Sequence, residues 1–278
     1  MAPLEGSFRH AGHRMTYDVY GEGENVIVLV HGLLMNRRMY ERLAPELAAR
    51  GNRVVTVDLL GHGRSDRPVD PRLYNMTAFA EQVLGLLDHL KLEAPVVGGT
   101  SLGANVGLEF AARHPERAGG LFIEMPVLDN ALLGAAMIFT PMLLALRIGE
   151  PVLRVLAAGA RRIPRTVGLV DMGLDWVRQD PAPSRAVLEG ILFGRTAPPR
   201  EERQRLRMPA LVIGHPSDPL HPFSDADMVA EEMTGARLVD ANSILEWRLN
   251  PGRLDDELSD FLKSVHTPAE PARRAAAA

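Results

Sequence analysis

The sequence predicts an α/β protein with a doubly wound, mostly parallel sheet that is interrupted by a helical insertion. Short runs such as residues 25–30 (NVIVLV) are apolar on both faces, as central parallel strands are. Strand-like and helix-like segments alternate along most of the chain, which is typical of a parallel sheet with crossover helices. Between residues 126 and 207 the strand signal disappears, and helical stretches alternate with prolines.

The elements follow one another in an order that fits a single interrupted sheet. The expected strands are an antiparallel segment over 8–20 that turns at Ala11–Gly12, then 25–30, 53–57, 94–97, 121–124, 210–213 and 237–239. One expected helix ends at Gly51 and a second covers 77–90. A third ends near His114, and a fourth covers 254–263. We therefore expect an α/β core from 1–125 and 208–265, a helical cap from 126–207 and a disordered tail at 266–278.

Composition excludes several classes of function. Apolar residues make up 46% and charged residues 24% of the chain, as in ordinary globular proteins. A net charge of −4 gives no sign of binding to nucleic acid or to an anionic membrane. The absence of cysteine excludes disulfides, thiolate metal sites and cysteine nucleophiles, and it permits the cytoplasmic location that we expect.

Neither a signal peptide nor a membrane span is predicted. The N-terminus lacks a basic start followed by an apolar run. The most apolar stretch, Ala131–Leu146, is interrupted by Thr140–Pro141 and is shorter than the roughly 20 residues that a span needs. No spacing of histidines and carboxylates suggests a metal site, and we expect no cofactor.

A serine elbow lies between a predicted strand and a predicted helix. Residues 99–103 (GTSLG) fit the pattern G-x-S-x-G, in which a tight turn exposes the serine hydroxyl at a helix N-terminus. Glycine is needed on both sides because a Cβ would collide with a neighbouring element. We predict Ser101 as the nucleophile, with the backbone N–H groups of Leu102 and Leu33 as the two donors that stabilise an oxyanion.

These motifs together resemble the α/β-hydrolase-fold superfamily over roughly residues 8–263. The matching pieces, in chain order, are His31–Gly32, Asp58 with residues 61–66 (GHGRSD), the elbow at Ser101, and Ser217–Asp218 after the strand at 210–213. The resemblance implies a serine hydrolase that acts on an ester, thioester, lactone, amide or carbon–carbon bond. These motifs do not identify its substrate or its oligomeric state.

The resemblance also places the catalytic acid. The family's acid follows the strand after the cap, and Asp218 matches that position in a loop stiffened by three prolines. Glu124 remains an alternative acid because it ends the preceding strand at the same sheet edge, where some relatives carry theirs.

The general base departs from the family pattern. In the family, a Gly-His pair normally follows the last strand, a few residues before a Glu and then a Pro. Here Glu246 and Pro251 match that Glu and Pro, and this alignment puts Ser243 in the place of the histidine. A hydroxyl with a pKa far above 7 cannot accept the nucleophile's proton. His221 is the best substitute, since it lies three residues past Asp218 at the same edge. His31 and His62 are expected to be structural.

Apolar residues of the cap are expected to roof a pocket above Ser101. Met137, Phe139 and Met142 are predicted to contact the substrate, which we expect to be a small apolar ester, thioester or lactone. An alternative is a small-molecule-binding or catalytically impaired relative that lacks the base. A lyase or a transferase on the same scaffold is a further alternative.

Overall fold

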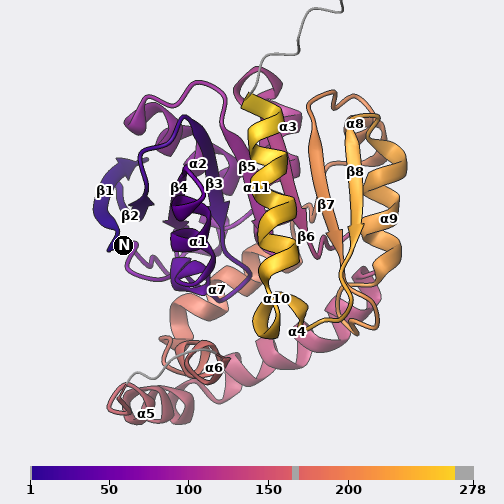
Figure 1. Cartoon of the computed structure of the whole chain (residues 1–278). Coiled ribbons are helices and arrows are strands. Elements are labelled where there is room, and N and C mark those ends of the chain that lie inside the picture. Colours follow the sequence, from indigo (N-terminus) through magenta and orange to yellow (C-terminus); the bar gives the residue numbers. More distant parts are fainter. Residues whose placement is uncertain (1, 165–168, 267–278) are drawn as a thin grey trace, which may run out of the picture.

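A computed structural model describes residues 2–164 and 169–266. Within them, eight strands form one sheet in the order β1-β2-β4-β3-β5-β6-β7-β8 (Figure 1). The strands are β1 (Leu4–His10), β2 (His13–Tyr20), β3 (Asn25–Val30), β4 (Asn52–Asp58), β5 (Val96–Thr100), β6 (Gly120–Glu124), β7 (Ala210–Gly214) and β8 (Ala236–Asp240). Only β2 pairs antiparallel to its neighbours, and the other pairs are parallel, so the predicted fold class is confirmed.

Helices cover both faces of the sheet, as a doubly wound fold requires. On one face, α1 (Leu43–Ala49) and α11 (Gly252–His266) pack on side chains such as Ile27, Leu29 and Phe122. On the other face lie α2 (Met76–Leu90), α3 (Leu102–Arg113) and α9 (Phe223–Glu232). Both faces of β3 are therefore buried, which explains its unbroken apolar run.

The parallel register brings several loops to one edge of the sheet. Thr100 at the end of β5 pairs with Glu124 at the end of β6, and Glu124 pairs with Ile213 near the end of β7. The loops that follow these three strands consequently leave the sheet side by side, at the edge where open α/β sheets bind their ligands.

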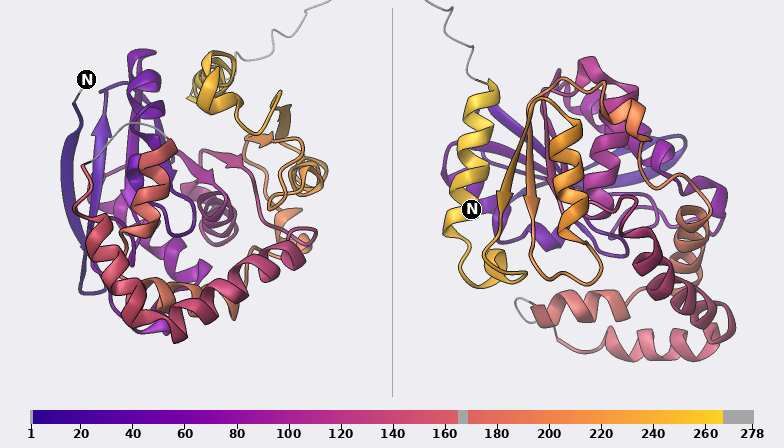
Figure 2. Two further views of the ribbon diagram at one scale, coloured as in Figure 1. Left: turned by 90° about the horizontal axis from the view of Figure 1, so that it is seen from below. Right: turned by 90° about the vertical axis from the view of Figure 1, so that its right-hand side faces the viewer.

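The segment between β6 and β7 contains only helices among its described residues. They are α4 (Leu132–Ile148), α5 (Glu150–Ala160), α6 (Leu169–Val177), α7 (Pro181–Leu192) and α8 (Arg200–Arg203). Figure 2 shows α4, α5 and α6 below the sheet edge as a layer of their own. We call residues 126–207 the cap; its boundaries and those of the core remain predictions.

Two expectations from the sequence need correction. The chain from 223 to 232 forms α9, although no helix was expected there; Ala226, Val229 and Met233 recur at helical spacing and are buried. His266 was assigned to the tail but belongs to α11, where Nε2 accepts a hydrogen bond of 3.3 Å from the N–H of Val26. Residues 267–278 of the expected tail lie outside the described residues.

No single helix among the described residues is long and apolar enough to cross a bilayer. Helices α4 and α5 meet the length and composition criteria only as a pair, and that pair is bent by 96°.

Candidate active site

Ser101 forms a strained turn between β5 and α3. Its φ and ψ angles are 56° and −109°, a conformation that non-glycine residues rarely adopt. The flanking glycines permit the turn, because a Cβ on Gly99 or Gly103 would lie 1.9 or 1.8 Å from the carbonyl oxygen of Val30. The Ser101 N–H donates to the carbonyl of Glu124 at 2.8 Å, which ties the turn to β6.

Residues 215–222 form the loop between β7 and α9, which we call the acid loop. Asp218 organises this loop, since its Oδ1 accepts hydrogen bonds from the backbone N–H groups of Leu220 (2.8 Å) and His221 (3.0 Å). Pro216, Pro219 and Pro222 restrict the remaining backbone angles. Asp218 and His221 are therefore held in one short, self-capped turn.

The structure brings Ser101, His221 and Asp218 together. His221 Nε2 lies 2.9 Å from Ser101 Oγ, and His221 Nδ1 lies 3.0 Å from Asp218 Oδ2. The side chains of His221 and Asp218 are 11% and 5% exposed. A proton on Nδ1 that is donated to Asp218 leaves Nε2 free to accept the serine proton.

The charged form of Asp218 is favoured in this arrangement. Burial alone would raise the pKa of its carboxyl group, but hydrogen bonds from the His221 side chain and from the N–H groups of His221 and Leu220 outweigh burial and lower that pKa. Asp218 is consequently an anion beside the imidazole at neutral pH.

A cavity of about 150 Å³ opens at Ser101. Its lining is mostly apolar and includes Leu33 and Leu102, the two expected oxyanion donors, and Phe139. The amide of Asn105, a polar lining residue, is already bonded to the backbone of Val127 and Thr196. This cavity can therefore hold an apolar group but offers few free polar partners for recognition.

Two of the three expected substrate contacts lie elsewhere. Met142 lines a neighbouring cavity of about 300 Å³, together with Leu34 and Trp176. Met137 is 64% exposed and is not among the residues that line the Ser101 cavity. On α4 the cavity is lined by Leu132, Ala135, Ala136 and Phe139, and at 100° per residue Met137 falls outside that stripe.

Glu124, the alternative acid, belongs to a second carboxylate–imidazole pair. Its Oε1 lies 3.1 Å from Nε2 of His215, and the two side chains are only 4% and 1% exposed. The hydroxyl of Thr100 donates to Oε2 of Glu124, and Nδ1 of His215 lies 3.3 Å from the carbonyl oxygen of Ser243. The structure thus pairs His221 with Asp218 and leaves Glu124 to His215.

From the sequence, His215 is only a minor candidate for the general base, because it opens the acid loop, and its pairing with Glu124 was not expected. His215 opens the loop after β7 at the edge where Glu124 ends β6, which places the two side chains within reach. Burial lowers the pKa of His215, but the hydrogen bond and the charge of Glu124 outweigh burial, so the net shift is upward.

The loop after β8 has a structural role. The side chain of Ser243 is exposed, so the position of the usual histidine faces solvent. Glu246 accepts hydrogen bonds from the N–H and side chain of Asn242 and from Arg253, and these bonds lower its pKa to about 2. Glu246 therefore anchors the loop and does not reach the Ser101 site.

His31 and His62 are buried and support the loops around the site. His31 Nε2 accepts from the N–H of Leu59 at 3.1 Å, and His62 Nδ1 lies 3.0 Å from the carbonyl of Leu60. Burial lowers the pKa of both imidazoles, which keeps them neutral.

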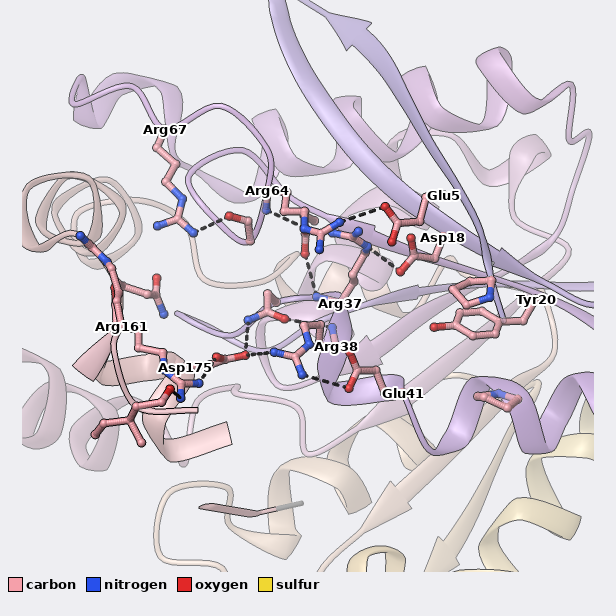
Figure 3. A pocket seen from close by; sticks show the side chains of 18 residues that line it. Glu5, Asp18, Tyr20, Arg37, Arg38, Glu41, Arg64, Arg67, Arg161 and Asp175 are labelled. Atoms are coloured by element: carbon pink, nitrogen blue, oxygen red, sulfur yellow. Dashed lines mark hydrogen bonds and ion pairs between the residues drawn. The ribbon is translucent and has the colours of Figure 1, made fainter. Parts of the chain in front are cut away.

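A hollow of about 790 Å³ is a polar crevice at the side of the cap. Figure 3 shows that its arginines and carboxylates face one another. Arg37 pairs with Asp18 at 2.7 Å, and Arg38 pairs with Asp175 of α6 at 3.1 Å. The Arg38–Asp175 pair joins core and cap, and Ser101 and His221 do not line the crevice. Among the described residues, no group of three or more His, Asp or Glu is arranged to hold a metal ion.

Comparison with known proteins identifies relatives over part of the sequence. The chain is 37% identical to the AB hydrolase superfamily protein YisY of Bacillus subtilis over 94 residues, 34% of each protein. It is 40% identical to a 2-hydroxymuconate semialdehyde hydrolase of Pseudomonas sp. over 79 residues, 28% of this chain and 27% of that enzyme. The chain thus spans about a third of the length of these curated relatives.

Solved structures are similar over nearly the whole chain. The enol-lactonase of Burkholderia xenovorans LB400 superimposes with a TM-score of 0.75 at 24% identity, covering 93% of this chain and all of that one. A thermophilic esterase of Thermogutta terrifontis has a TM-score of 0.73 at 21% identity, over 96% of this chain and all of that one. A sequence model described as the alpha/beta hydrolase fold matches residues 25–164. With half of its length matched, the chain belongs to the α/β-hydrolase-fold family, whose relatives are hydrolases.

Proposed function

We propose that the protein is a serine hydrolase in which His221 replaces the histidine usually found after the last strand. The proposal rests on two consecutive contacts. Ser101 Oγ lies 2.9 Å from His221 Nε2, and His221 Nδ1 lies 3.0 Å from Asp218 Oδ2. The same three roles in the same geometry define catalytic triads on unrelated folds.

The proposed reaction follows from these positions. Ser101 Oγ attacks the carbonyl carbon of the substrate while Nε2 of His221 accepts its proton. The Leu33 and Leu102 N–H groups stabilise the oxyanion, and Asp218 stabilises the imidazolium. His221 then returns the proton to the leaving alcohol or thiol as the carbon–oxygen or carbon–sulfur bond breaks. A water molecule, deprotonated by His221, hydrolyses the acyl-enzyme and releases a carboxylic acid.

The cavity supports a small apolar acyl group. An apolar cavity of about 150 Å³ in another protein accommodates benzene, so a space of this size holds about six carbon atoms. The substrate class we propose is therefore an ester, thioester or lactone with a short or cyclic apolar acyl part. The similarity to an enol-lactonase and an esterase in fold agrees with this class of carbonyl substrate.

Labelling with a fluorophosphonate tests the proposal, because the probe reacts with an activated serine and requires no knowledge of the substrate. We expect wild-type protein to be labelled and Ser101→Ala to be unlabelled. His221→Ala should lose labelling almost completely, since removing the base of a serine protease lowers turnover by about 10⁶.

His266→Ala is the matched control for the base. It removes the only histidine that follows the usual base position, and that side chain bonds to the backbone of Val26 and Leu262. Full labelling of His266→Ala beside a loss in His221→Ala supports the proposal. Unlabelled wild-type protein would instead favour the alternative, a binding protein on the same scaffold. Full labelling of His221→Ala would refute the role of His221.

A further inference from the structure

An exposed apolar surface runs along the outside of the cap. We call it the cap face and define it by six residues of α4 and α5, each more than half exposed: Leu133, Met137, Leu144, Ile148, Val152 and Val155. The four on α4 fall within a 60° arc at helical spacing. Leu144, Ile148 and Val152 line one shallow apolar hollow where the two helices meet, so the surface continues from α4 onto α5 there.

Contiguous apolar surface of this kind marks a site of interaction with a protein or with a membrane. The charge of the cap distinguishes the two. Residues 131–164 contain four arginines and one glutamate, a net charge of +3, whereas the whole chain carries −4. Arg162, just after α5, is exposed and forms no ion pair with a carboxylate of the described residues. Arg161 instead lines the polar crevice of Figure 3 and donates to the carbonyl of Arg178 at 2.9 Å. Arg154 pairs with Glu150 at 2.7 Å, and Arg147 lies 3.6 Å from Glu189.

From this arrangement we propose that the cap face docks on an anionic lipid surface. Helices that lie in a membrane interface combine an apolar face with arginines at its border, and anionic lipid adds attraction for each basic residue. Trp176 of α6 is 44% exposed beside this layer, and tryptophan is enriched at membrane interfaces. The bend of 96° between α4 and α5 suits a helix pair lying on a surface (Figure 2).

A second copy of the chain fits the cap face less well. A twofold contact places the same patch on both subunits, so the positive charges of one cap would meet those of the other. Anionic headgroups neutralise the same charges. The overall negative charge of the chain then orients the molecule with the cap toward the membrane and the core away from it.

The apolar hollow of the cap face adjoins a second apolar cavity, lined mostly by residues of the cap. The hollow between α4 and α5 shares Ala145 and Leu153 with the 300 Å³ cavity, whose lining includes Leu34. The cavity at Ser101, which Leu33 lines, shares no lining residue with the 300 Å³ cavity.

Vesicle co-sedimentation tests the docking without any measurement of catalysis. We expect wild-type protein to sediment with phosphatidylcholine vesicles that contain phosphatidylglycerol, less with phosphatidylcholine alone, and less as salt increases. Leu133→Asp and Val155→Asp should each weaken binding by about tenfold, because each removes the burial of one apolar side chain. Leu4→Asp is the matched control, since Leu4 is 73% exposed but lies on β1, against 71% for Leu133 and 72% for Val155.

Charge is tested separately. Arg162→Glu should weaken binding about fivefold or more, whereas Arg205→Glu, an exposed arginine outside the cap face, should leave it unchanged. Circular dichroism and fluorophosphonate labelling of every variant show whether fold and serine reactivity persist. If the wild-type protein binds vesicles but does not react with the fluorophosphonate, the hydrolase proposal is refuted and the docking proposal stands.

Three results would overturn the docking. One is a wild-type protein that does not sediment with anionic vesicles. Another is a set of cap-face variants that bind as well as Leu4→Asp. The third is a wild-type dimer in light scattering that Leu133→Asp and Val155→Asp convert to monomers, which would assign the cap face to a second copy.

Discussion

Glu124→Gln is expected to destabilise the protein in a pH-dependent way. The substitution preserves the shape of the side chain and an oxygen for the Thr100 hydroxyl, but it removes the charge that faces His215. In the wild-type protein this pair is 3.1 Å apart, and its side chains are 4% and 1% exposed. The other facing groups are Asp218, which also raises the pKa of His215, and the carbonyl of Ser243.

The expected magnitude follows from the burial of the pair. Removing one partner of a buried ion pair costs about 3–5 kcal/mol, and we take the lower end because glutamine still accepts a hydrogen bond. In a protein of this size, about 3 kcal/mol lowers the melting temperature by roughly 6–10 °C.

The sign of the pH dependence follows from the raised pKa of His215. A raised pKa in the folded state means that protonated His215 contributes stability, which is fully present below the unfolded histidine pKa of about 6.5. This contribution is lost as the pH rises through the higher folded value. The difference between wild type and Glu124→Gln should therefore be largest near pH 5–6 and should shrink in alkaline solution.

Chemical denaturation at several pH values measures this difference, and Glu81→Gln is its control. Glu81 Oε1 lies 3.1 Å from His114 Nε2, the same atoms at the same distance, but these side chains are 32% and 19% exposed. An exposed pair contributes about 1 kcal/mol or less. Equal losses in the two variants, or a Glu124→Gln loss that stays constant or grows with pH, would refute the reasoning.

Four further substitutions probe the site and its supports. Asp218→Asn keeps an oxygen for the two backbone N–H groups of the acid loop but not the anion beside His221, so turnover should fall by about 10⁴ while the melting temperature changes little. Gly103→Ala places a Cβ 1.8 Å from a backbone carbonyl of β3 and should cost about 3 kcal/mol or more in urea titration. Gly159→Ala on α5, where nothing lies within 4 Å, should instead stabilise by about 0.5–1 kcal/mol. Phe139→Ala enlarges the Ser101 cavity, and an ester panel should show a shift of the best acyl chain to greater length; an unchanged optimum would contradict the proposed acyl site.

Most of the sheet could be predicted from the sequence because strands that are buried on both faces consist almost entirely of apolar residues. The runs that became β3, β5 and β7 have no polar side chains except a final threonine in β5 and an initial asparagine in β3. Helix α9 was missed because its stretch contains four acidic residues among ten, and the apolar positions that face the core are few. Local hydrophobicity reports burial well only when most of a segment is buried.

The site could be predicted only where spacing along the chain determines spacing in the fold. Asp218 and His221 lie on one turn, so their proximity to each other follows from sequence separation. The contact between Glu124 and His215 depends on the register of β6 against β7, which no local pattern reveals. The orientation of Met137 likewise depends on which side of α4 faces the core, and a helix whose residues are apolar except for Thr140 and Arg147 carries little information about that choice.

In the proposed triad, acid and base share one loop, and this changes what the geometry of the site depends on. In the family pattern the histidine comes from the loop after the last strand, so its distance from the acid depends on how two loops pack. Here the acid loop sets that distance by itself, because Asp218 accepts the N–H of His221 as well as facing its imidazole. The loop after β8 is then free to contact His215 through Ser243, and the buried Glu124–His215 pair holds it against the elbow. A histidine introduced at position 243 would start from an exposed side chain, and Glu124 at the end of β6 is already bonded to His215. We therefore expect the double variant Ser243→His/His221→Ala to remain without fluorophosphonate labelling. Recovered labelling would show that a histidine at the family's usual position, 243, can still reach Ser101.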